Sequence, residues 1–301
     1  MNSVEDKSIH IPQEAFDWYD QYAHGGMDRR TFMTKLGTLA AVGYSMTVLT
    51  TALLPNYALA EQVSFNDEGI LATYEQFDSP DGHGKGQGYI VKPTTDQKNY
   101  PVVLVIHENR GLNPYVKDVA RRLAKAGFLA FAPDALFPVG GYPGNDDEGR
   151  TMQRGLDRGK IQNDFVAAAD HLKSHALSNG KLGAVGFCFG GYMVNYLAAV
   201  ESDLLSAGVP FYGTPASKKL RKNIKAPLMI QLGELDKRVN ASWPEYEADL
   251  KANQVDYQMY MYENAHHGFH NDSTSRYDKT QADLAWQRTV DFFNAKLKGQ
   301  S

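Results

Sequence analysis

Short apolar runs that alternate with longer helix-like segments are the feature of this sequence that most constrains its fold. Seven runs rich in β-branched and aromatic residues lie at 89–91, 102–106, 128–132, 182–187, 207–212, 227–232 and 257–262. Five segments with helix-like patterns lie at 114–126, 160–177, 190–200, 243–253 and 279–297. Short, continuous apolar strands separated by helices predict a mainly parallel sheet that helices cover on both faces. We therefore expect an α/β fold with a central parallel sheet.

The domain organisation follows from the same pattern. Residues 69–92 have the character of an antiparallel start to the sheet, and the Gly- and Pro-rich stretch 138–144 is expected to be a loop within the domain. No internal repeat or inter-domain linker interrupts the remainder. We predict one domain over 61–301, long enough to bury a core of its own, preceded by an N-terminal extension over 1–60.

The composition limits what the chain can do. The 301 residues are 43% hydrophobic with a formal net charge of −4, which is typical of a packed soluble protein and gives no general attraction to nucleic acid or anionic lipid. The single cysteine, Cys188, excludes an internal disulfide and a cysteine-based metal site. We expect no cofactor, so the function must rest on a few placed side chains.

The first sixty residues have the pattern of an export signal. Residues 36–60 carry no charged side chain, and a stretch of this length either spans a bilayer or forms the apolar core of a signal peptide. The twin arginines Arg29 and Arg30 precede it, and the small-x-small pattern that signal peptidase recognises ends at Ala60.

This segment resembles a twin-arginine (Tat) signal peptide. The resemblance implies passage through the Tat machinery, cleavage near Ala60 and a periplasmic or otherwise exported protein with no stable membrane partner. The alternative is an N-terminal membrane anchor that is not cleaved.

The strand predicted at 182–187 runs directly into the candidate nucleophile. Gly186, Cys188 and Gly190 form a G-x-C-x-G turn between a strand and a helix. A residue on so tight a turn holds its side chain clear of the sheet, at a helix N-terminus whose dipole favours a thiolate. The pattern alone is also compatible with an ordinary buried cysteine, but its place between a strand and a helix favours a nucleophile.

Two later strands are followed by a candidate acid and a candidate base. Asp236 follows the strand at 227–232, and His266, His267 and His270 follow the strand at 257–262. The order nucleophile, acid, base is typical of the α/β-hydrolase triad. No carboxylates at metal-binding spacing accompany these histidines, and we predict no metal site.

Several linked motifs resemble the dienelactone hydrolase family of α/β-hydrolases over residues 88–297. The motifs are H-E-x-x-G-L-N from His107, A-P-D from Ala132, G-F-C-x-G-G from Gly186, G-E-L-D from Gly233 and H-G-F from His267. The resemblance implies an α/β-hydrolase fold and an enzyme that cleaves a small-molecule ester or lactone, dienelactone-like or broader.

The resemblance also assigns roles to particular residues. Because the family places its base directly before G-F, His267 is expected to be the base in preference to His266. Glu108 is the carboxylate near the resting thiol. The backbone N–H groups of Asn109 and Phe189 are expected to form the oxyanion hole.

The mechanism that this implies is acyl transfer through a covalent thioester. Cys188, assisted by His267 and Asp236, attacks the carbonyl carbon, and water activated by His267 then releases the acyl group. Two alternatives from other classes stay open: an exported thiol protein that responds to redox state, and a non-catalytic binding module on the same fold. The missing second cysteine argues against the first, and the intact Cys–His–Asp set argues against the second.

The substrate is less well defined by the sequence. Family members that cleave dienelactone are expected to bind its carboxylate with arginines, one of them shortly after A-P-D, yet no arginine occurs here between that motif and Arg150. Arg276 is a candidate for the other arginine. Phe137 and Tyr142 are candidates for lining the substrate pocket.

Overall fold

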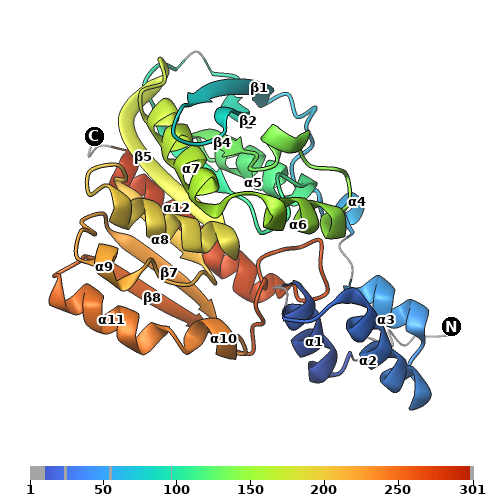
Figure 1. Cartoon of the computed structure of the whole chain (residues 1–301). Helices are drawn as coiled ribbons and strands as arrows, with labels where there is room; N and C mark the ends of the chain where they lie inside the picture. Colours follow the sequence, from blue (N-terminus) through green and yellow to red (C-terminus); the bar gives the residue numbers. More distant parts are fainter. Residues whose placement is uncertain (1–10, 24–25, 54–55, 96, 299–301) are drawn as a thin grey trace, which may run out of the picture.

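A computed structural model describes residues 11–23, 26–53, 56–95 and 97–298 (Figure 1). Its centre is one sheet of eight strands in the order β1-β2-β4-β3-β5-β6-β7-β8. The strands are β1 (Ile70–Ser79), β2 (Gly84–Pro93), β3 (Tyr100–Ile106), β4 (Leu129–Pro133), β5 (Ser178–Phe187), β6 (Ala207–Phe211), β7 (Leu228–Gly233) and β8 (Tyr257–Tyr262).

The pairing of the strands confirms the predicted α/β sheet. Strands β4, β3, β5, β6, β7 and β8 are parallel to their neighbours, whereas β1 pairs with β2, and β2 with β4, in the antiparallel sense. The predicted antiparallel start of the sheet is therefore present as β1 and β2. All the carboxyl ends of the parallel strands lie at one edge, where binding sites of open α/β sheets form.

Helices cover both faces of the sheet (Figure 1). The main helices of this domain are α5 (Pro114–Lys125), α6 (Asp146–Gly155), α7 (Arg158–Lys173), α8 (Phe189–Val200), α11 (Trp243–Ala252) and α12 (Lys279–Leu297). The shorter ones are η1 (Phe137–Val139), α9 (Lys218–Arg221) and α10 (Lys237–Asn240). Alternate residues of β3 enter different cores, since Leu104 packs with α7 and α8 while Val103 and Val105 pack with α5 and α12.

Helix α6 is an element that the sequence analysis did not predict. It follows the expected loop at 138–144, and its sequence is strongly polar, so no long apolar stripe marks it. The available signal was at its start, where the Asn145 side chain accepts hydrogen bonds from the backbone N–H groups of Asp147 and Glu148. This omission matters because α6 carries part of the site described below.

The N-terminal segment forms a small helical unit of its own. It contains α1 (Gln13–Ala23), α2 (Arg29–Ala41), α3 (Met46–Leu53) and α4 (Tyr57–Ala60). Its apolar cluster is separate from both cores of the sheet domain and comprises Ala15, Tyr19, Tyr22, Phe32, Leu36, Leu39, Leu49 and Leu53. Figure 1 shows α1 in dark blue beside the loop that leads into α12.

The uncharged stretch 36–60 is divided among three of these helices rather than forming one. In the part of the chain that the structure describes, no helix combines the length and the apolar character needed to cross a membrane. Residues 1–10 of the predicted signal lie outside the described residues.

Candidate active site

Cys188 occupies a strained turn between β5 and α8. Its backbone angles are φ 57° and ψ −108°, a left-handed conformation that costs free energy for a residue with a side chain. The glycines on either side are required by close backbone contacts: a Cβ atom on Gly190 would lie 2.1 Å from the Ile106 carbonyl oxygen, and one on Gly186 would lie 2.2 Å from that of Gly190. The turn therefore holds a half-buried thiol at the N-terminus of α8.

Asp236 and His267 meet at the ends of two neighbouring strands. Asp236 follows β7, His267 follows β8, and the His267 Nδ1 atom lies 2.5 Å from the Asp236 Oδ2 atom. Both side chains are buried, and the other carboxylate oxygen accepts a hydrogen bond from the Val239 backbone N–H. A carboxylate that accepts the Nδ1–H leaves the lone pair of His267 on Nε2, the arrangement that a general base requires.

Tyr212 connects this pair to the thiol. It directly follows β6 with a positive φ of 37°, and its ring centroid lies 4.9 Å from that of His267. Burial raises the pKa of its phenol well above the usual value, and the nearby acidic groups of Glu108 and Cys188 act in the same direction. The Tyr212 hydroxyl therefore stays protonated.

Glu108 lies in a rigid loop after β3. Its carboxylate is buried and accepts a hydrogen bond of 3.1 Å from the Asn271 side-chain amide. The loop is fixed by His107, which accepts a hydrogen bond from the Ala135 backbone N–H and donates one to the Glu108 carbonyl oxygen. Burial lowers the pKa of His107, so the imidazole is neutral and can make both bonds.

A cleft of about 460 Å³ opens above Cys188. Its wall contains both residues of the expected oxyanion hole, Asn109 and Phe189, together with Tyr212. Four arginines line it and no acidic residue does: Arg150 and Arg154 from α6, Arg158 at the start of α7, and Arg238 from α10. Such a cleft attracts anions. Arg150 and Arg154 were not assigned to the site from the sequence because α6 was not predicted.

A second, smaller cavity of about 230 Å³ lies beside His267. Residues of α1 form one of its walls, and the loops after β7 and β8 form the other. Its lining residues are Phe16, Asp17, Gln21, Leu235, Asp236, Lys237, Arg238, His266, His267 and Arg276. Arg238 borders both the cleft and this cavity.

The three candidate substrate residues lie outside the cleft. Arg276 is buried and borders the second cavity. Phe137 is in η1, and the Tyr142 hydroxyl donates a hydrogen bond of 2.8 Å to Asp146. Neither Phe137 nor Tyr142 lines the cleft or the second cavity.

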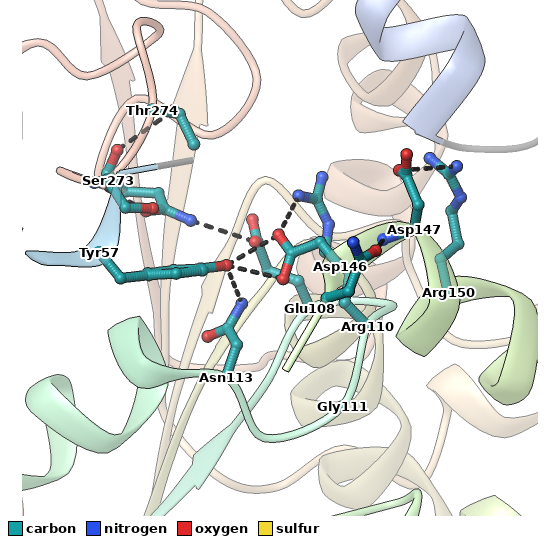
Figure 2. A network of polar contacts seen from close by, with 12 residues as sticks. Tyr57, Glu108, Arg110, Gly111, Asn113, Asp146, Asp147, Arg150, Ser273 and Thr274 are labelled. Carbon is teal, nitrogen blue, oxygen red and sulfur yellow. Dashed lines mark hydrogen bonds and ion pairs between the residues drawn. The ribbon is translucent and has the colours of Figure 1, made fainter. Parts of the chain in front are cut away.

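A buried polar network supports the loop after β3 (Figure 2). The Tyr57 hydroxyl lies 2.8 and 2.7 Å from the two carboxylate oxygens of Asp146, and the Asn113 side-chain amide donates to that hydroxyl at 2.8 Å. The Arg110 guanidinium donates to the same carboxylate at 2.8 Å. Tyr57 belongs to the N-terminal segment, so that segment contributes directly to the surroundings of the site.

Within the described ranges, no group of three or more His, Cys, Asp or Glu side chains is arranged to hold a metal ion. What the arrangement offers chemically is a thiol on a strained turn, a buried imidazole–carboxylate pair and a cationic cleft.

Two family models and several curated proteins match parts of this chain. A family model described as "Dienelactone hydrolase family" matches residues 87–297, and one described as "YqhI-like" matches residues 3–41. The "Putative carboxymethylenebutenolidase" of Aquifex aeolicus is 34% identical over 71% of this chain and 95% of its own length. The "Putative hydrolase fragment YghX" of Escherichia coli is 60% identical over 35% of this chain and 90% of its own length.

Among solved structures, a dienelactone hydrolase-like promiscuous phosphotriesterase from metagenomic libraries is 25% identical with a TM-score of 0.65. The alignment covers 76% of this chain and 99% of that one.

Proposed function

Because the chain belongs to the dienelactone hydrolase family, we propose that it hydrolyses a carboxylic ester or lactone through a covalent thioester at Cys188. The observation that carries this proposal is the strained turn at Cys188, with φ 57° enforced by glycines on both sides. Backbone strain of this kind persists where the surrounding structure holds it, and it is common at active sites. The buried His267–Asp236 pair at the neighbouring strand ends supports the same reaction.

The reaction follows from the chemistry of these groups. The Cys188 sulfur attacks the carbonyl carbon while the thiol proton passes to His267 Nε2. The C–O bond then breaks, and the alcohol leaves with that proton. Water next gives a proton to His267 and attacks the thioester, which releases the acid and restores the thiol. Two backbone donors, the N–H groups of Asn109 and Phe189, stabilise the oxyanion in both halves of the reaction.

Glu108 is proposed to act on the resting thiol. Its carboxylate is buried and held by Asn271, and the protonated Tyr212 hydroxyl lies in the same electrostatic environment as Glu108 and Cys188. A fixed negative charge near the thiol disfavours the thiolate. We therefore propose that Cys188 stays a neutral thiol until substrate enters.

The cleft indicates the class of substrate. Four arginines and no acidic residue line the approach to Cys188, so a substrate with a carboxylate on its acyl part is favoured over a neutral one. We propose an anionic ester or lactone.

The test is a panel of esters, lactones and thioesters, each with and without a carboxylate on the acyl part. The Cys188→Ala variant is expected to lose hydrolysis entirely while its circular dichroism and melting temperature stay those of the wild type. Electrospray mass spectrometry of the wild type mixed with a slow ester should show the acyl adduct on Cys188. Unimpaired hydrolysis by Cys188→Ala would refute the proposal.

We further propose that the chain is exported through the Tat machinery, on the basis of Arg29 and Arg30. Both arginines are exposed at the start of α2, where a receptor can reach them. Fractionation of the native host should find the protein in the periplasm with Glu61 as its first residue, and replacing both arginines with lysine should retain it in the cytoplasm. A protein that stays in the cytoplasm, or one that keeps residues before Glu61, contradicts export or cleavage respectively.

A further inference from the structure

Helix α1 packs directly on the loop that carries the base. The Phe16 ring centroid lies 4.5 Å from that of His266, the residue next to His267. The Gln13 side-chain amide nitrogen lies 3.4 Å from the same imidazole. The N-terminal segment is thus in contact with the catalytic loop although more than two hundred residues separate them in sequence.

Two tyrosines of α1 cover arginines around the site. The Arg276 guanidinium lies 4.7 Å from the centroid of the Tyr19 ring, and the Arg110 guanidinium donates a hydrogen bond of 3.2 Å to the Tyr19 hydroxyl. The Arg150 guanidinium lies 3.9 Å from the Tyr22 ring. Cation–π contacts of this kind fix both partners. They hold α1 in one position against the sheet domain.

The cavity enclosed by α1 has the features of a binding site. Phe16, Asp17 and Gln21 close it on one side, and its volume of about 230 Å³ admits only a small group. Arg276 lines it, is only 4% exposed, and has two guanidinium nitrogens, Nε and Nη1, with no hydrogen-bond acceptor in the described part of the chain. Buried donors are normally satisfied, so these two point to an oxygen-bearing ligand group.

The chemistry of the base identifies that group. In ester cleavage the histidine must deliver its proton to the departing oxygen, so the alcohol part of the substrate lies beside the histidine. The cavity that contains His267 is bounded by α1, whereas the arginine-lined cleft contains Cys188. The two sides of the scissile bond therefore face different surroundings.

We propose that α1 forms the wall of the leaving-group site, and that Phe16 and Gln21, which line the cavity, determine the size of the alcohol that the enzyme releases. The anionic acyl part occupies the cleft, and the alcohol part occupies the cavity beside His267. This proposal rests on the proposed esterase function and concerns the uncleaved chain, in which the N-terminal segment is a specificity element. Cleavage after Ala60 removes α1 and should open the leaving-group site.

The experiment measures kcat/KM in the full-length protein for two series of esters. One series keeps the acyl part and enlarges the alcohol from methyl through butyl to naphthylmethyl. The other keeps the methyl alcohol and enlarges the acyl part. For Phe16→Ala and Gln21→Ala, the ratio of naphthylmethyl to methyl ester should rise about tenfold over wild type, while the acyl preference stays unchanged.

Two controls make the result specific. Tyr19→Phe keeps the ring and should keep the wild-type alcohol preference. Tyr74→Ala removes a half-exposed tyrosine from β1 in the sheet domain and should leave both series unchanged. An unchanged alcohol preference in Phe16→Ala and Gln21→Ala would overturn the proposal, as would an equal change in the alcohol and acyl series.

A second readout does not need ester turnover. Diethyl pyrocarbonate modifies accessible imidazoles, and mass spectrometry can follow its reaction with His267. The rate should rise at least severalfold in Phe16→Ala, which removes a ring from the cavity wall, and stay at the wild-type value in Tyr74→Ala. If no variant hydrolyses any ester, the esterase proposal fails, but a faster modification still supports α1 as the wall of the cavity. An unchanged modification rate would contradict the assignment of α1 as the wall of this cavity.

Discussion

The sheet domain and the N-terminal helices are held in place by different kinds of contact. The sheet domain buries two extensive apolar clusters, one on each face of the sheet. The N-terminal helices bury one small cluster and touch the sheet domain largely through arginine–tyrosine and polar contacts, at Arg110, Arg150 and Arg276.

This difference predicts different responses to perturbation. Apolar burial contributes about 25 cal/mol per Å² and is shared over a whole cluster, whereas a cation–π contact is worth about 0.5–2 kcal/mol and acts between two residues. We therefore expect the N-terminal helices to open locally before the sheet domain unfolds. Four measurements, from the largest expected effect to the smallest, test this contrast.

The largest effect is expected at the turn after β5. In Gly190→Ala the new Cβ atom would lie 2.1 Å from the Ile106 carbonyl oxygen, a backbone atom that cannot move without displacing β3. Unfolding in urea, followed by circular dichroism, should show a loss of about 3 kcal/mol, the range found when a packed interior is overfilled. A change below about 0.5 kcal/mol would show that the turn is not rigid.

A pH-dependent effect is expected from His270, which is buried in the same domain. Burial, reinforced by Arg122, lowers the pKa of His270 from 6.5 to about 3. Between these values the unfolded chain binds a proton that the folded chain does not. Stability is therefore full above pH 6.5 and falls as the pH decreases toward 3, by up to about 1.4 kcal/mol per pH unit.

His270→Gln removes this proton uptake. Urea unfolding at pH 7, 5.5 and 4 should show a shallower loss of stability with acidification than in the wild type. The comparison uses the slope because the substitution also changes the contact with the Tyr115 hydroxyl, which lies 2.7 Å from His270 Nδ1. Equal slopes in the two proteins would contradict the assignment.

A smaller effect is expected where the two regions meet. Tyr57→Phe removes the hydroxyl that contacts Asp146 and Asn113 in the network of Figure 2. A buried polar group left without its partner costs about 1–3 kcal/mol, and the loss should appear in urea unfolding. Tyr260→Phe, whose hydroxyl donates to the exposed Gln258, is the matched control and should change stability by less than about 0.5 kcal/mol.

The smallest effect, of opposite sign, is expected inside α2. Gly37 has nothing within 4 Å of the place where a Cβ atom would be, so Gly37→Ala should stabilise the helix by about 0.5–1 kcal/mol. Hydrogen exchange should slow in α2 and stay unchanged in β3. Equal slowing in both would mean that the two regions unfold as one unit, and it would contradict the expectation that the N-terminal helices open first.

The sequence predicted the sheet well because its strands carry a local signal. Runs such as 102–106 and 128–132 are continuously apolar, as is typical of buried parallel strands, and the structure has β3 and β4 there. Helix α6 lacked such a signal, because a polar surface helix needs no apolar stripe. Its arginines, Arg150 and Arg154, are two of the four that make the cleft cationic, and they could not be placed there without it.

Some residues of the candidate site were likewise predictable from the sequence, and others were not. Cys188, Asp236 and His267 follow predictable strands, so their meeting at one edge of the sheet followed from chain order. The placement of Tyr19 against Arg276 depends on how the N-terminal helices dock on the sheet domain. No local sequence pattern around either residue encodes this docking. Asn271, which holds Glu108, was also missed, since an amide in a loop has many possible partners.

The single cysteine also allows the number of intact sites in a preparation to be measured. Cys188 is the only cysteine among the 301 residues, and it lines the cleft. One equivalent of a chromogenic thiol reagent consumed per folded chain therefore counts the chains in which the proposed nucleophile is intact. Rates measured on any preparation can then be expressed per working molecule rather than per milligram of protein.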